Sequence, residues 1–120
     1  MNTHGRRVQG FDNDQVAADW PAISDREIAW LRGRFTVLEG DCHLLWHSPR
    51  PMSAAAIVES RSGRIFVKRH HRSVRSADTL TEEHRFIAHL AGAGVPVVHV
   101  LHDSHGHTAI EHEGWTYELH

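Results

Sequence analysis

One residue stands apart by its chemistry: Lys68 is the only lysine in a chain whose other twelve basic side chains are arginines. A primary amine concentrates its charge at one point, whereas a guanidinium spreads it over a wide planar fork. The composition therefore indicates that an amine is needed at this position. Lys68 lies in the alternating segment 64–71, where it shares one side of a predicted strand with Phe66.

A helical segment after that strand places a carboxylate among apolar side chains. Spacings of 3, 4 and 3 residues put four side chains on one helix face, namely Leu80, Glu83, Ile87 and Leu90. A carboxylate in an apolar stripe is costly unless a partner stabilises it. We therefore expect Glu83 to pair with Lys68. The alternative is a surface ion pair between strand and helix, which stabilises a fold by less than about 1 kcal/mol.

The elements that hold these residues can be placed from local patterns. Residues 1–22 are polar and typical of an extended arm. Ser24 and Glu27 form a capping box, which predicts a helix over residues 25–32 that stops at Gly33. We expect this short helix to dock on the domain that follows it.

The remaining elements alternate between strands and one long helix. Strand patterns cover residues 35–38 with 44–46, 54–59, 64–70, 107–111 and 115–119. Extended or turning connections are predicted for residues 47–53, 60–63 and 95–101. The long helix is predicted to begin at its N-cap Asp78 and to end within residues 91–94. These patterns predict an α+β fold with an antiparallel sheet of about five strands and one main packed helix, preceded by a short N-terminal helix.

Composition limits the classes of function. The 120 residues, 40% of them hydrophobic, suit a single domain with a modest core. A net charge of −2 argues against a general polyanion binder. The single cysteine, Cys42, cannot form an internal disulfide, no apolar run approaches the roughly 20 residues of a membrane span, and no secretory signal is recognisable. We expect a cytoplasmic protein that does not interact with membranes.

Three other chemistries are possible from residue type but poorly supported by spacing. The densest of the thirteen histidines are His102, His105 and His107, which lack the second ligand cluster typical of zinc sites, so no metal site is predicted. The basic run 61–75 lacks interleaved stacking aromatics, which argues against nucleic-acid binding. Cys42 has no histidine and acid at a spacing that would indicate a nucleophile.

Four segments in order resemble the aminoglycoside phosphotransferase family, which includes choline and homoserine kinases and belongs to the protein kinase-like superfamily. They are Phe66-Val-Lys68, the run Glu83 to Leu90, Gly94-Val-Pro-Val97 and Gly114-Trp-Thr-Tyr-Glu118. The resemblance covers about residues 35–120. It implies that these residues form the N-terminal, nucleotide-binding lobe, with residues 1–34 as an arm and short helix, and that the C-terminal catalytic lobe is absent.

The resemblance also implies roles for five residues at a site for ATP. Lys68 would hold the α- and β-phosphates, and Glu83 would orient it. Phe66 would line the nucleotide cleft, and Ser53 would offer a group to phosphate. Glu118 falls where the family's hinge meets the adenine edge. The substrate would be a small molecule with a hydroxyl group, phosphorylated with ATP and Mg²⁺.

Two departures from the family pattern limit these expectations. Residues 48–53, where the family's phosphate-covering loop lies, contain no glycine. No asparagine follows Asn13, so the family's aspartate base and its metal-binding asparagine have no counterpart. We therefore expect the base and Mg²⁺ ligands in the absent lobe and no turnover by the 120 residues alone. The alternative is a free-standing α+β interaction or regulatory module, which would pair with a protein partner or self-associate.

Overall fold

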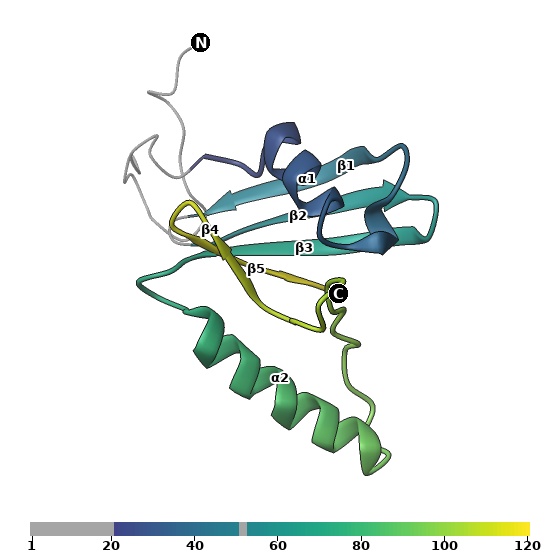
Figure 1. The fold of residues 1–120 in the computed structure, drawn as a ribbon, viewed down its shortest axis with the longest axis vertical. Helices are drawn as coiled ribbons and strands as arrows, with labels where there is room; N and C mark the ends of the chain where they lie inside the picture. Colours follow the sequence, from purple (N-terminus) through teal and green to yellow (C-terminus); the bar gives the residue numbers. More distant parts are fainter. Residues whose placement is uncertain (1–20, 51–52) are drawn as a thin grey trace.

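Five strands form one antiparallel sheet in the computed structural model, which describes residues 21–50 and 53–120. The elements in chain order are α1 (Asp25–Arg32), the 3-10 helix η1 (Thr36–Leu38), β1 (His43–Arg50), β2 (Ser53–Ser60), β3 (Gly63–His71), α2 (Ala77–Gly92), β4 (Ile110–His112) and β5 (Trp115–Leu119). The spatial order of the strands is β1-β2-β3-β5-β4. Helices α1 and α2 lie on opposite sides of the sheet (Figure 1). The predicted α+β class and the five-stranded antiparallel sheet are confirmed.

The face of the sheet toward α1 carries the hydrophobic core. Alternate residues of β2 and β3 point to this face and are buried. They pack with residues from α1 and η1, and the core comprises Ile23, Ile28, Leu31, Phe35, Leu38, Ala54, Ala56, Val58, Ile65, Val67, Ile110, Tyr117 and Leu119. The short helix therefore shares one core with the sheet.

The capping box fixes the start of α1 as predicted. The Ser24 hydroxyl accepts from the backbone N–H of Glu27 at 3.2 Å, and a carboxylate oxygen of Glu27 accepts from the backbone N–H of Ser24 at 2.9 Å. The helix bounds match those read from the sequence. The predicted arm, residues 1–22, lies outside the described residues except for its last two.

Two predictions between α1 and β2 are wrong. Residues 36–38 form a turn of 3-10 helix rather than a strand, because Phe35 and Leu38 are both drawn into the core on the same side. Residues 47–50, predicted as a loop, continue β1 to Arg50. A proline is tolerated there because β1 is an edge strand, where one row of backbone groups needs no partner. Of the predicted loop, residues 51–52 lie outside the described part.

The boundaries of α2 differ slightly from the prediction. Its N-cap is Ser76, two residues before Asp78, and the Ser76 hydroxyl accepts from the backbone N–H of Thr79 at 3.1 Å. Beyond the helix, Gly94 takes a φ of +85°, a left-handed conformation that glycine adopts without strain. The extended run 95–101 adds no strand to the sheet, although the N–H of Leu101 donates to the carbonyl of Leu119 at 2.9 Å.

None of the described helices combines the length and apolar character needed to cross a membrane.

Candidate functional site

Strand register gathers four of the five predicted site residues on one face of the sheet, which we call the open face. Phe66 and Lys68 alternate with the core residues of β3 and so point away from α1. Lys68 lies directly opposite Glu118 of β5, and Ser53 of β2 lies opposite His70 of β3. Directly opposite residues of an antiparallel pair share a face. The open face therefore carries Ser53, Phe66, Lys68 and Glu118.

Glu83 does not join them. Its side chain is 49% exposed and forms an ion pair with Arg75. The buried positions of α2 are Leu80 and His84, which are four residues apart, so His84 takes the place that the predicted stripe gave to Glu83. The prediction that Glu83 lies on a buried stripe is wrong, and within the described residues no hydrogen bond or ion pair joins it to Lys68.

A buried cluster of polar side chains takes the position expected for Glu83. The Glu118 carboxylate is 5% exposed and lies 2.7 Å from His70 Nε2, 2.9 Å from His84 Nε2 and 3.0 Å from His120 Nε2. An ionised carboxylate only accepts hydrogen bonds, so each of these nitrogens must carry the proton and donate. Because the three histidines come from β3, α2 and the residue after β5, the cluster ties α2 to the sheet.

The cluster keeps Glu118 charged despite its burial. Burial works to raise the pKa of Glu118, but the bonds from His120, His70 and His84 together with the charge of Lys68 outweigh it. The net result is a pKa of Glu118 far below the ordinary 4.5. Sequence reasoning assigned Glu118 to a hinge and the histidines to the surface. Alternation along β3 already put His70 on the face of Lys68, but only the register of β3 with β5 brings Glu118 to that face.

Lys68 itself is half-buried, and within the described residues its ammonium makes no hydrogen bond or ion pair. Its charge is close enough to Glu118 to lower the pKa of that carboxyl group. A compact cation on a flexible stem, held beside a buried anion and otherwise unbound, can accept an anionic group of a ligand.

An open hollow of about 610 Å³ lies on the same face of the sheet, and Phe66, two residues before Lys68 on β3, is part of its lining. Its lining is mostly apolar and consists of Leu45, Trp46, Ile57, Arg64 and Phe66. Leu45 and Trp46 are 45% and 48% exposed, which is high for residues of their size. Phe66 precedes Lys68 by two residues on β3, which places their Cα atoms roughly 7 Å apart. The hollow can hold a flat apolar group while Lys68 contacts an anionic group attached to it.

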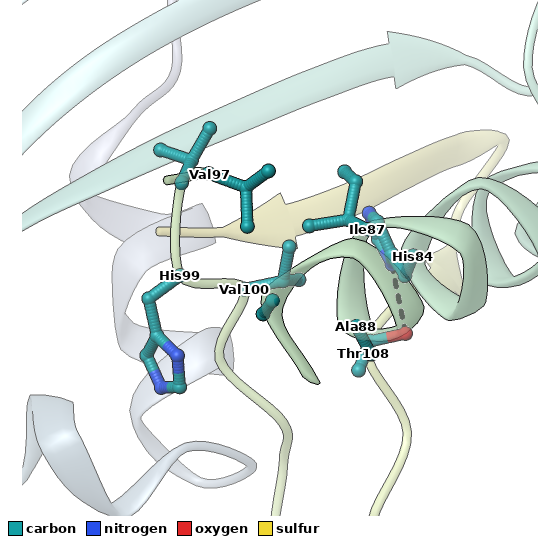
Figure 2. A pocket seen from close by; sticks show the side chains of 9 residues that line it. His84, Ile87, Ala88, Val97, His99, Val100 and Thr108 are labelled. Carbon is teal, nitrogen blue, oxygen red and sulfur yellow. Dashed lines mark hydrogen bonds between the residues drawn. The ribbon is translucent and has the colours of Figure 1, made fainter. Parts of the chain in front are cut away.

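A second, narrower hollow of about 290 Å³ lies between α2 and residues 97–100 (Figure 2). Ile87, Val97 and Val100 line it, and His84 and Thr108 form a hydrogen bond of 2.7 Å beside it. His84 thus uses one ring nitrogen for Thr108 and the other for Glu118. This bridging anchors the helix where its apolar contacts with the sheet are few.

The α1 face has a polar group of a different kind. Arg69, 1% exposed, donates to both carboxylate oxygens of Glu27 at 2.8 and 2.9 Å, and Tyr117 donates to Glu27 at 2.6 Å. The guanidinium also lies 4.0 Å above the ring of Trp115. Burial works to raise the pKa of Glu27, but these bonds lower it overall. Both carboxylate oxygens of Glu27 accept hydrogen bonds, so Glu27, Arg69 and Tyr117, which we call the Glu27 group, hold α1 to the sheet.

The turn that carries His105 and His107 is organised by Asp103. The backbone N–H groups of His105 and His107 both donate to Asp103 Oδ1 at 2.9 Å, so the carboxylate organises this turn. Across residues 21–50 and 53–120, no group of three or more histidine, cysteine or acidic side chains is arranged to hold a metal ion. The Cys42 thiol donates to the carbonyl of Leu38 at 3.0 Å.

Comparison with known proteins gives one match. Residues 53–120 match the model of the phosphotransferase enzyme family. No curated protein and no solved structure matches the chain. The match begins at β2 and includes β3, α2 and the β4–β5 hairpin, which together carry Lys68, His84 and Glu118. Because it covers more than half of the 120 residues, this chain belongs to the phosphotransferase enzyme family.

Proposed function

We propose that the open face binds ATP and that the chain is the nucleotide-binding part of a kinase that phosphorylates a hydroxyl group of a small molecule. The observation that carries the proposal is the position of the only lysine: its ammonium is not bonded to any described residue, and it lies on the same strand and face as Phe66, which lines an apolar hollow. Family membership supports the reaction class. Cytoplasmic location stays a prediction from the sequence.

The hollow suits the base of the nucleotide. Its exposed aromatic and aliphatic side chains, Trp46 and Leu45 among them, offer a surface on which a flat ring can stack. Phe66 extends this surface toward Lys68 along β3. A base in the hollow would direct its phosphates along the open face, toward Lys68 and Ser53.

Lys68 suits the phosphates. Its ammonium is a point charge with three donors, and it can contact phosphate oxygens without the planar geometry that arginine requires. Ser53, half-buried at the start of β2, shares the face and can donate its hydroxyl. These groups would orient the triphosphate and offset part of its charge, which is how positioning assists phosphoryl transfer.

The described residues do not fit the Mg²⁺ that phosphoryl transfer uses. Mg²⁺ requires several oxygen ligands in octahedral geometry. On the open face the carboxylate at the centre of the histidine cluster is Glu118, and three N–H groups take three of its roughly four acceptor sites, which leaves too few oxygens for the metal. We therefore propose that the metal ligands and the catalytic base belong to a second lobe outside the described residues.

The test is a calorimetric titration of the chain with ATP, in wild type, Lys68→Ala and the matched control Arg72→Ala, whose side chain is exposed just beyond β3. Loss of a charge-assisted contact worth about 1.5–3 kcal/mol predicts roughly 10- to 150-fold weaker binding for Lys68→Ala. Arg72→Ala should bind as wild type does. Equal binding by Lys68→Ala and wild type would refute the assignment.

Exposed apolar side chains favour a second candidate, an interaction module. Phe86 on α2 and Val98 after it are 62% and 63% exposed. Large apolar groups left in solvent often contact a partner or a second copy of the chain. Sedimentation of wild type and Phe86→Ser over a range of concentrations separates the candidates. An interaction module requires association that Phe86→Ser weakens, in a chain that binds no ATP.

A further inference from the structure

We propose that Glu118, rather than Glu83, is the carboxylate that positions the Lys68 ammonium, and that His70, His84 and His120 hold this carboxylate in place. The inference rests on the proposed function in one respect, because it concerns the residue assigned to the phosphates. It assigns a positioning role that neither the sequence nor the family match gives to Glu118.

Strand pairing brings the two residues together. Lys68 and Glu118 are direct partners in the antiparallel β3–β5 ladder, so their Cβ atoms are expected about 4.5–5.5 Å apart on one face. The ion pairs that Glu118 makes with described residues are those with the three histidines, but the lysine side chain is long enough to cross the separation and reach the carboxylate. The charge of Lys68 already contributes to the lowered pKa of Glu118.

The carboxylate has room for one more donor. Its Oε1 accepts from His84 and His120, and its Oε2 accepts from His70. An ionised carboxylate offers about four acceptor sites, so one site on Oε2 is left after these three bonds. A lysine ammonium is a suitable fourth donor, and its positive charge would balance the buried negative charge of Glu118.

The surroundings of Glu118 also make it a better positioning group than Glu83. Glu118 is held from three sides and is 5% exposed, so its oxygens have a fixed location. Glu83 is 49% exposed and already paired with Arg75. Electrostatic attraction across the exposed surface is weakened by water, whereas it is stronger beside a buried carboxylate.

Chemical labelling can test the pairing because the chain has one lysine. We would acylate the protein over a range of pH and follow the Lys68 peptide by mass spectrometry, apart from the peptide that carries the N-terminal amine. A nearby carboxylate favours the charged amine, which does not react. In Glu118→Gln we expect the rate profile to move to lower pH by about half a unit or more, with roughly threefold faster labelling on its rising part.

The controls separate charge from structure. Glu118→Asp keeps the charge and should keep the wild-type profile more closely than Glu118→Gln does. Glu83→Gln removes the charge of the rejected candidate and should leave the profile unchanged. An unchanged profile in Glu118→Gln, or an equal displacement in Glu83→Gln, overturns the proposal.

A second measurement covers the case in which Glu118→Gln does not fold. In Lys68→Met the carboxylate remains but loses its proposed partner, so the pKa of Glu118 should rise toward its ordinary value. Acid unfolding should then begin at a higher pH than in wild type, whereas Arg72→Met should behave as wild type does. Coincident acid transitions for Lys68→Met and wild type overturn the pairing.

None of these measurements uses a nucleotide. A chain that fails to bind ATP but shows the displaced profile would refute the proposed function and leave the pairing of Lys68 with Glu118 intact. A chain that binds ATP through Lys68 and shows no displacement would refute the pairing alone.

Discussion

Two neighbouring cations of β3 lie in opposite environments on the two faces of the sheet. Arg69 points toward α1, where it is 1% exposed and bonded to Glu27. Lys68, one residue earlier on β3, points to the open face, where it is half-buried and makes no hydrogen bond or ion pair with a described residue. A single step along a strand separates a cation used for structure from one left for a ligand.

The two faces also differ in how much of their surface is free to bind a ligand. On the α1 face, the apolar core is packed and, in the Glu27 group, Glu27 accepts from Arg69 and Tyr117, although Arg69 Nε has no hydrogen-bond partner among the described residues. On the open face, α2 is held mainly through Leu80 and the His84 bridge, and an apolar hollow stays uncovered. The α1 face therefore supplies most of the stability, whereas the open face keeps the side chains that a ligand could contact.

The largest expected effect is on the α1 face. Replacing Arg69 by leucine removes one partner of a buried pair and leaves the Glu27 carboxylate uncompensated, which typically costs about 3–5 kcal/mol. Urea unfolding would measure the loss, with Arg72→Leu as the exposed control, expected within about 0.5 kcal/mol of wild type. If Arg69→Leu is as stable as this control, the α1 face does not depend on its buried pair.

A smaller effect, dependent on pH, is expected from Glu118 on the open face. At neutral pH, Glu118→Gln should lose about 1–3 kcal/mol, because three donors lose a charged acceptor. The pKa of Glu118 in the folded state lies below its ordinary value of 4.5, so its stabilisation is complete above that pH and is lost as the pH falls through the folded pKa.

The free energies of unfolding of wild type and Glu118→Gln should therefore converge as the pH is lowered from about 5 toward 2. Urea unfolding at several pH values would measure the convergence. A difference that stays constant over this range would mean that the carboxylate is not charged in the folded protein.

A still smaller effect is expected in the hollow. Removing the Trp46 ring should weaken ATP binding by about 1 kcal/mol, roughly fivefold, because an aromatic surface for the base is lost. The stability should change little, since the side chain is 48% exposed. Calorimetry on Trp46→Ala and on the control Phe86→Ala, which is exposed on α2, would measure it. Equal losses in both variants would argue against the hollow as the base site.

The smallest effect on stability and ATP affinity is expected at Glu83, which the sequence analysis predicted to pair with Lys68. Glu83→Gln breaks only an exposed ion pair with Arg75 and should cost less than about 1 kcal/mol in stability. ATP affinity should stay within twofold of wild type. A tenfold loss of ATP affinity in Glu83→Gln would restore Glu83 as the partner of Lys68 and remove the contrast drawn between it and Glu118.

Much of the fold could be predicted because local chemistry fixes it. Ser24 and Glu27 satisfy each other's backbone groups and mark the start of α1 without help from distant residues. The turn at Gly63, whose φ is +117°, joins β2 and β3 as alternation and glycine indicated. Residues 36–38 were misread because a β-rich composition gave no sign that Phe35 and Leu38 would both enter the core.

The sequence by itself determined that a lone lysine lies on a strand with Phe66 and that a helix and a strand pair follow, because alternation and capping are local. Only the tertiary structure decided which acid faces Lys68. Glu83 and His84 are adjacent in sequence, and the rotation of α2 against the sheet decides which of the two side chains points to the open face. That rotation brings His84 within hydrogen-bond distance of Glu118, which is 34 residues away in the sequence, and no local pattern encodes it.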